Sequence, residues 1–155
     1  MLINNLEFAK NNESFTKVFQ ISEFARAFDM LESLEGELKV NVIGNFDDKP
    51  ILIISIYGKI YTSCQSCLNK LEIIIDNKSK VSIFNNDSEL DQALFDENSA
   101  THDGVVADSQ FNLFDFIEDE IIMLLPFAPK HEQCSNELSI QDANHPFAQL
   151  KDLIN

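Results

Sequence analysis

Hydrophobic and polar residues alternate along the middle of the chain, from about residue 38 to residue 84. The first alternating run begins at Leu38, the second is ILIISIYGKIYTSC, and two more lie on either side of the turn-like segment 76–78. A period of two residues is typical of β-strands that bury one face. Because short polar turns separate these runs, the pattern predicts an antiparallel meander.

The period becomes helical in two other places. In SEFARAFDMLESL, Phe24, Phe28 and Leu31 fall on one stripe, which predicts an amphipathic helix. NLFDFIEDEIIMLL predicts a second and stronger helix, which ends before Pro126 because proline cannot continue a helix. Pro146 suits the first position of a short C-terminal helix.

The remaining segments complete one domain. Residues 2–8 are predicted to form a short strand, and residues 85–104 a polar, acidic loop with at most a helical turn at 90–94. A length of 155 residues with 45% hydrophobic residues suits a single core. We therefore expect an α+β fold: an antiparallel β-sheet meander packed with a few helices, in a single domain over residues 1–155.

The charge of the chain bears on its partners. It has 26 acidic and 11 basic residues, a formal charge of −15, and Arg26 is its single arginine. Nucleic-acid affinity comes largely from Lys and Arg, so direct binding to DNA or RNA is expected to be weak or absent. A basic partner protein fits this surface better, although acidity that serves only solubility is the other interpretation.

No targeting or membrane segment is apparent in the sequence. The N-terminal residues lack the basic start and apolar stretch of a signal peptide. The longest apolar runs are shorter than the ~20 residues that span a bilayer. The number of cysteines is odd, which argues against a secreted disulfide framework. We expect a cytoplasmic protein that does not contact membranes.

The three cysteines are candidate metal ligands. Cys64 and Cys67 form a CxxC pair, and His131 and Cys134 form an HxxC pair further along the chain. Four such ligands would complete a structural zinc site. Two other interpretations stay open: ordinary structural cysteines near a bend in the sheet, and a redox pair. The redox pair is disfavoured because the flanks of CQSCL resemble strands rather than a helix N-terminus.

One acidic residue of the second helix is placed unusually. On a helical wheel that starts at Leu113, Glu120 falls at about 340°, inside the apolar stripe, while the other acids fall opposite. A buried carboxylate must be paired, hydrogen-bonded or protonated. Glu120 is therefore predicted to be either a catalytic acid or ligand, or a structural residue satisfied by backbone N–H groups, a lysine or Arg26.

Enzymatic chemistry has little support in the residues. The chain lacks GxxxxGK[ST], GxGxxG, GxSxG and HExxH, so we expect no enzyme. The alternative from this class is a metal-dependent hydrolase or nuclease that uses Glu120. Such a site would need two or more converging carboxylates, and the neighbouring acids point away on the wheel.

Four motifs follow one another along the chain: GKIYTSCQSCLNKLEI, a helix that ends in EDEIIMLLP, PKHEQC, and HPFAQLKDL. Together they resemble the YceD family, described as large ribosomal RNA subunit accumulation proteins, from about Glu35 to the C-terminus. The family's C-x-R-C-L corresponds to CQSCL, with Ser66 in place of arginine. Its N-P-F-A-x-L corresponds to HPFAQL, with His145 in place of asparagine.

The resemblance implies a function in ribosome biogenesis. It implies a cytoplasmic factor for the synthesis, processing or stability of large-subunit (23S) ribosomal RNA, and family members are often encoded beside a small basic ribosomal protein. The expected partner is a basic ribosomal protein or a large-subunit assembly factor, bound through protein contacts rather than catalysis. A zinc-binding interaction or RNA-associated module is the alternative. The structural or interaction residues that the motifs imply are Leu68, Glu120, Pro126, Pro146, Phe147 and Leu150.

Overall fold

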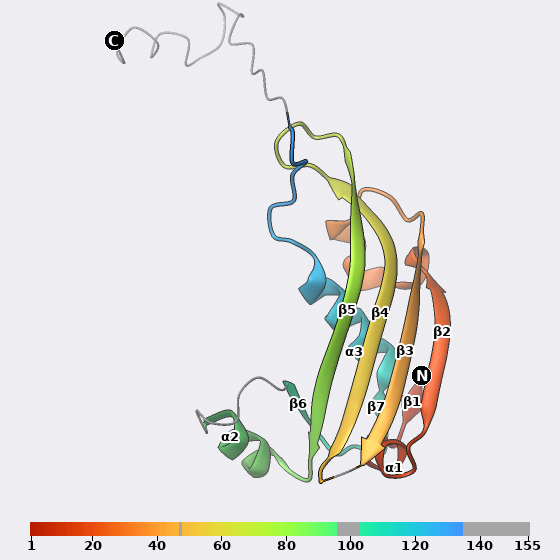
Figure 1. Ribbon diagram of the computed structural model, residues 1–155, viewed down its shortest axis with the longest axis vertical. Coiled ribbons are helices and arrows are strands. Elements are labelled where there is room, and N and C mark those ends of the chain that lie inside the picture. Colours follow the sequence, from red (N-terminus) through yellow and green to blue (C-terminus); the bar gives the residue numbers. More distant parts are fainter. Residues whose placement is uncertain (47, 96–102, 135–155) are drawn as a thin grey trace, which may run out of the picture.

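A five-stranded sheet in the order β2-β3-β4-β5-β6 forms the centre of the molecule (Figure 1). The structure is a computed structural model and describes residues 1–46, 48–95 and 103–134. A smaller sheet pairs β1 with β7. The strands are β1 (Leu2–Ile3), β2 (Ser14–Gln20), β3 (Glu37–Phe46), β4 (Pro50–Ser63), β5 (Lys70–Phe84), β6 (Asp103–Val106) and β7 (Phe111–Asn112).

Helix α3 lies behind the sheet in Figure 1, and no described element covers the opposite face. The helices α1 and α2 lie at one end of the sheet. The helical elements are α1 (Asn5–Lys10), the 3₁₀ segments η1 (Ile21–Glu23) and η2 (Ala25–Met30), α2 (Asp87–Phe95) and α3 (Leu113–Leu124). The predicted α+β class is thus confirmed. No helix in the described ranges has both the length and the apolar character to cross a membrane.

The sheet is mixed rather than purely antiparallel. Neighbouring strands from β2 to β5 pair antiparallel, as the meander predicted, but β6 pairs parallel to β5. A parallel pair needs a crossover connection, and α2 lies between these two strands in the sequence. The segment 85–104, predicted as a loop, therefore contains α2 and the start of β6; residues 96–102 lie outside the described ranges.

The core lies between the sheet and α3. The alternate hydrophobic residues of β3 and β4 that point to this side are at most 1% exposed, so the predicted two-residue period is confirmed for these strands. Phenylalanines from β2 and from the turn after η1 complete the packing, with Phe24 stacked on Phe114 at 5.5 Å. The fully buried members include Leu38, Val40, Val42, Leu52, Ile54, Ile56, Ile60, Leu113, Ile117 and Ile121.

Several strand predictions were wrong. Residues 2–8 form β1 and the start of α1 rather than one strand, and β2 was not predicted. The turn expected at 76–78 is the middle of β5, where these polar residues pair in register with Tyr57, Ile56 and Ser55. Pairing with a long neighbouring strand outweighs the weak strand propensity of Asp and Asn.

The first predicted helix was also wrong in type. SEFARAFDMLESL contains η1 and η2 instead of an α-helix. Phe24 and Ala27 are both buried, and their three-residue spacing suits the 3₁₀ repeat. The backbone N–H of Ala27 accordingly bonds the carbonyl of Phe24 at 3.2 Å.

Candidate metal centre

The turn between β4 and β5 presents the first two cysteines. Its backbone is closed by two hydrogen bonds of 2.9 Å, from the Cys64 N–H to the Asn69 carbonyl and from the Leu68 N–H to the Cys64 carbonyl. Leu68 has a φ of 61°, a left-handed conformation that costs a non-glycine residue about 1–2 kcal/mol. The turn therefore holds its CxxC pair in a conformation that extended strand residues would not adopt.

The other two ligands come from the segment that follows α3. Leu125 leaves the helix with an extended backbone, Pro126 prevents its continuation, and the chain then runs to the β4–β5 turn (Figure 1). The backbone N–H of Gln65 donates a 2.8 Å hydrogen bond to the carbonyl of Pro129. This bond fixes the second segment beside the turn and brings His131 and Cys134 to it.

The four predicted ligands meet in one cluster. One atom each of Cys64, Cys67, His131 and Cys134 lies within 4.8 Å of the others. The Cys64 and Cys134 sulfurs are 3.6 Å apart, and the Cys67 sulfur is 3.5 Å from His131 Nδ1. In a tetrahedral zinc site with Zn–S bonds of about 2.3 Å, two sulfurs lie about 3.8 Å apart and a sulfur and a nitrogen about 3.6 Å. These two separations are thus close to the edges of a zinc tetrahedron.

Backbone N–H groups of the turn favour ionised sulfur. Burial opposes ionisation of the Cys64 thiol, but the N–H groups of Cys67, His131 and Ser66 donate to its sulfur and lower its pKa from 9.0 to about 5. The N–H of Asn69 lowers the pKa of Cys67. Because metals bind the thiolate, the turn prepares both cysteines as ligands through hydrogen bonds that the metal itself does not make.

The other two ligands retain their protons more strongly. Hydrogen bonding to Cys64 and Cys67 raises the pKa of His131, and the bond with Cys67 raises the pKa of Cys134. A divalent cation can replace those protons as the partner of the two thiolates. Its binding would release protons, so the metal affinity of this group is expected to rise with pH.

The composition of the group indicates the kind of site. Three cysteines and one histidine are a common structural zinc set, whereas a catalytic zinc keeps one position open for water or substrate. Four protein ligands leave no such position. All three cysteines are free thiols, and neither Cys64 nor Cys67 lies at a helix N-terminus, the placement that activates redox pairs.

The acid buried by α3 is Glu118, not Glu120. Glu118 is 3% exposed, and it accepts 2.6 Å hydrogen bonds from the backbone N–H and from Nε of Arg26. Glu120 is half-buried and accepts a 2.8 Å hydrogen bond from Ser79 Oγ. The predicted wheel was centred near Leu113, but the buried arc extends through Ile117 to Ile121, at about 80°.

This shift of the buried arc explains the difference. Glu120 lies at one edge of the arc and Glu118 at the other, where η2 covers the helix. Arg26 also bonds Asp119 Oδ1 at 2.7 Å and the Asp115 carbonyl at 2.6 Å, so it fastens η2 to α3. The suggested partnership of Glu120 with Arg26 is wrong, and Arg26 binds the neighbouring acids instead.

Converging carboxylates, which a nuclease would need, do not accompany Glu120. Within the described ranges, the cysteine–histidine group is the one set of three or more metal-ligating side chains that meets closely enough to hold an ion. Glu118 and Asp119 are engaged by Arg26. The geometry therefore favours the metal centre over Glu120 as the functional site.

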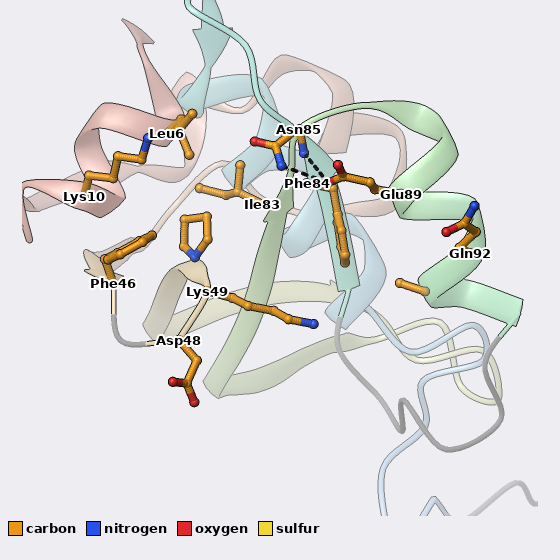
Figure 2. Close-up of a pocket in the computed structure, with 12 residues that line it drawn as sticks. Leu6, Lys10, Phe46, Asp48, Lys49, Ile83, Phe84, Asn85, Glu89 and Gln92 are labelled. Atoms are coloured by element: carbon orange, nitrogen blue, oxygen red, sulfur yellow. Dashed lines mark hydrogen bonds between the residues drawn. The ribbon is translucent and has the colours of Figure 1, made fainter.

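A separate pocket of about 520 Å³ is lined by residues of α1, α2 and the ends of β3 and β5 (Figure 2). Leu6, Ile83 and Phe84 contribute apolar walls, and Lys49 extends across it. The Glu89 carboxylate accepts hydrogen bonds from the N–H and side chain of Asn85. It thereby closes the turn before α2 and is engaged within the fold, so this pocket carries no assigned chemistry.

The remaining predicted residues divide into three groups. Leu68 is 76% exposed at the tip of the turn, and Pro126 ends α3 beside the second half of the metal centre. Pro146, Phe147 and Leu150 lie outside the described residues. The sequence reasoning missed Gln65 and Pro129, whose backbone groups join the two halves, because a bond between two main-chain groups leaves no trace in residue type.

Comparison of the chain with family models, with curated proteins and with solved structures found no match.

Proposed function

We propose that the chain is a non-catalytic binding protein whose Cys64, Cys67, His131 and Cys134 hold a structural Zn²⁺ ion. The observation that carries this proposal is the meeting of these four ligands from two segments more than 60 residues apart. The hydrogen bonds that favour the Cys64 and Cys67 thiolates support it. The ion would fasten the segment after α3 to the tip of the β4–β5 hairpin.

The zinc site is tested by metal analysis of the purified, reduced protein. We expect about one zinc per chain, because structural sites bind zinc tightly enough to retain it through purification. Cys64→Ser should remove the zinc and lower the thermal midpoint. Gln65→Ala, in the same turn but without a ligand atom, should retain both.

Cobalt titration gives a second measurement. Co²⁺ added to the metal-free protein should produce the thiolate-to-cobalt absorption of a tetrahedral thiolate site, and Zn²⁺ should abolish it. A folded wild-type protein that contains no metal, gives no cobalt spectrum and is unaffected by Cys64→Ser would overturn the proposal.

For the biological function, we propose a factor in the synthesis, processing or stability of large-subunit ribosomal RNA. The four ordered motifs that resemble the YceD family support this function. The formal charge of −15 supports a basic ribosomal protein or assembly factor as partner, because complementary charge steers association.

This function is tested by affinity purification at native salt concentration. We expect basic large-subunit ribosomal proteins or precursor subunits with the wild-type chain, released as salt is raised. The control is the same purification with the zinc-free Cys134→Ser variant, compared at equal amounts of folded protein. Recovery of no ribosomal protein, assembly factor or precursor subunit would contradict the proposed function while leaving the zinc measurement valid.

A further inference from the structure

The face of the sheet opposite α3 carries much of the basic charge of this acidic chain. Strand residues that alternate with the buried ones point to it, and no described element covers it (Figure 1). With Glu35, whose carboxylate bonds Lys70 at this face, the charged groups sum to +1, against −15 for the whole chain. Those on the strands are five lysines and three carboxylates. They are Lys39, Lys59, Lys70, Lys78 and Lys80, and Glu37, Glu72 and Asp76.

Three of these lysines are available to a ligand. Lys59 bonds Glu72 at 2.9 Å, and Lys70 bonds Glu35 at 2.8 Å. Lys39, Lys78 and Lys80 form no salt bridge with any residue that the structure describes. All three are exposed. The free cations of this face therefore lie on β3 and β5, on either side of β4.

Tyr57 on β4 lies between them. It is 61% exposed. The strand register places Lys39 directly opposite it on β3 and Asp76 directly opposite it on β5, with Lys78 diagonally across on β5. Tyr61, the second tyrosine of the chain, is covered by the Lys70 ammonium at 4.0 Å from its ring centroid. Tyr57 is thus the tyrosine of this face that remains open for stacking.

We propose that this uncovered face binds single-stranded RNA, with a base stacked on Tyr57 and phosphates held by Lys39 and Lys78. An open aromatic ring among lysines on a sheet is the arrangement with which proteins hold unpaired nucleotides. Stacking needs an unpaired base, so duplexes are not expected to bind. This inference goes beyond the proposed function, which acts through a protein partner, and does not depend on zinc.

The overall negative charge does not prevent such contact. At physiological salt the Debye length is about 8 Å, so carboxylates elsewhere on the molecule are largely screened at this face. The expectation of weak or absent nucleic-acid binding came from the charge of the whole chain. The uneven distribution of this charge over the sheet makes weak, salt-sensitive RNA binding the expected outcome.

The test is fluorescence anisotropy with labelled 12-nucleotide poly-U and poly-A RNA, the matching DNA, and an RNA duplex, all with the full chain and starting at about 0.1 M salt, where the Debye length is about 10 Å. We expect saturable binding of the single strands that weakens as salt rises. Tyr57→Ala should weaken it about tenfold. The pair Lys39→Glu and Lys78→Glu should weaken it more than Tyr57→Ala does and reduce the salt slope by about 1.4.

The matched control is the pair Lys10→Glu and Lys49→Glu, which makes the same charge change at the pocket beside α1. It should alter affinity less than about twofold. Because these side chains are exposed, all variants should have the same thermal midpoint as the wild type. Their affinities are compared only where the midpoints are equal. Absence of saturable oligonucleotide binding, equal weakening by the control pair, or binding only of a partner protein by this face would overturn the proposal. Equal binding of DNA and RNA would overturn its RNA selectivity.

Discussion

Glu118 and Glu120 show how differently two carboxylates of one helix can be held. The Glu118 carboxylate is buried and bonded twice by Arg26, whereas Glu120 is half-buried and bonded by one serine hydroxyl. A hydrogen bond to a charged group contributes about 1.5–3 kcal/mol, and a bond between partly exposed groups contributes less. Glu118 should therefore matter more to stability, although the sequence pattern favoured Glu120.

We expect Glu118→Ala to lower the free energy of unfolding by about 2 kcal/mol, because η2 loses its attachment to α3. The matched change Glu120→Ala should lower it by less than about 1 kcal/mol. Urea denaturation of both variants at pH 7 provides the comparison. If Glu120→Ala proves the more damaging, the assignment of the buried acid to Glu118 is wrong.

Among single residues, the metal ligands were predictable and the buried acid was not. Cys64, Cys67, His131 and Cys134 were identified from residue type and spacing alone, since few side chains bind zinc. The burial of Glu118 depends on Arg26, 92 residues away, which the helical pattern of α3 does not contain. Ligand chemistry is local in sequence, whereas ion-pair partners depend on the tertiary fold.

At the scale of elements, α1 packs on β3 with almost no space between their backbones. A Cβ atom added at Gly44 would overlap the carbonyl oxygen of Phe8 and lie 2.8 Å from the Cα of Ala9. Both obstacles are main-chain atoms and cannot rotate away. The contact between α1 and the sheet therefore requires glycine at this position.

Gly44→Ala should lower the free energy of unfolding by about 3 kcal/mol, because α1 must move away from the sheet. Gly104→Ala is the control: its added Cβ would meet side-chain atoms of Leu90 and Phe84, which can change rotamer. A loss of about 1 kcal/mol is expected there. Calorimetric melting of the two variants measures the difference, and equal losses would contradict the close packing of α1.

The elements with a clear period were predicted, and those without one were missed. β3, β4 and α3 have long alternating or helical patterns, and each was placed within a few residues of its observed bounds. β2 alternates poorly, with Phe19 its single buried residue. As an edge strand it is fixed mainly by pairing with β3, which no pattern within its own seven residues encodes.

At the scale of the whole molecule, like charge works against the folded state. The formal charge is −15, and the described residues form five salt bridges, of which four join exposed side chains. Exposed pairs contribute little, while net charge destabilises a compact state through self-repulsion. Composition predicted the size of this charge, but its concentration away from one sheet face required the strand register.

Raising NaCl from about 50 mM to about 500 mM should increase the thermal midpoint of the zinc-loaded protein, because salt shortens the Debye length and screens this repulsion. Differential scanning fluorimetry across the salt series measures the shift. The Lys10→Glu and Lys49→Glu variant, which is more negative, should show a larger increase. A midpoint that falls with salt would mean that the ion pairs outweigh the repulsion.

The order of synthesis on the ribosome determines when the ligands of the metal centre become available. Cys67 emerges 64 residues before His131, a delay of roughly 3–13 s at about 5–20 residues per second. β5, β6, β7 and α3 are synthesised within that interval, and β1 to β4 precede it. The complete set of four ligands therefore exists only after every described strand and helix has been made.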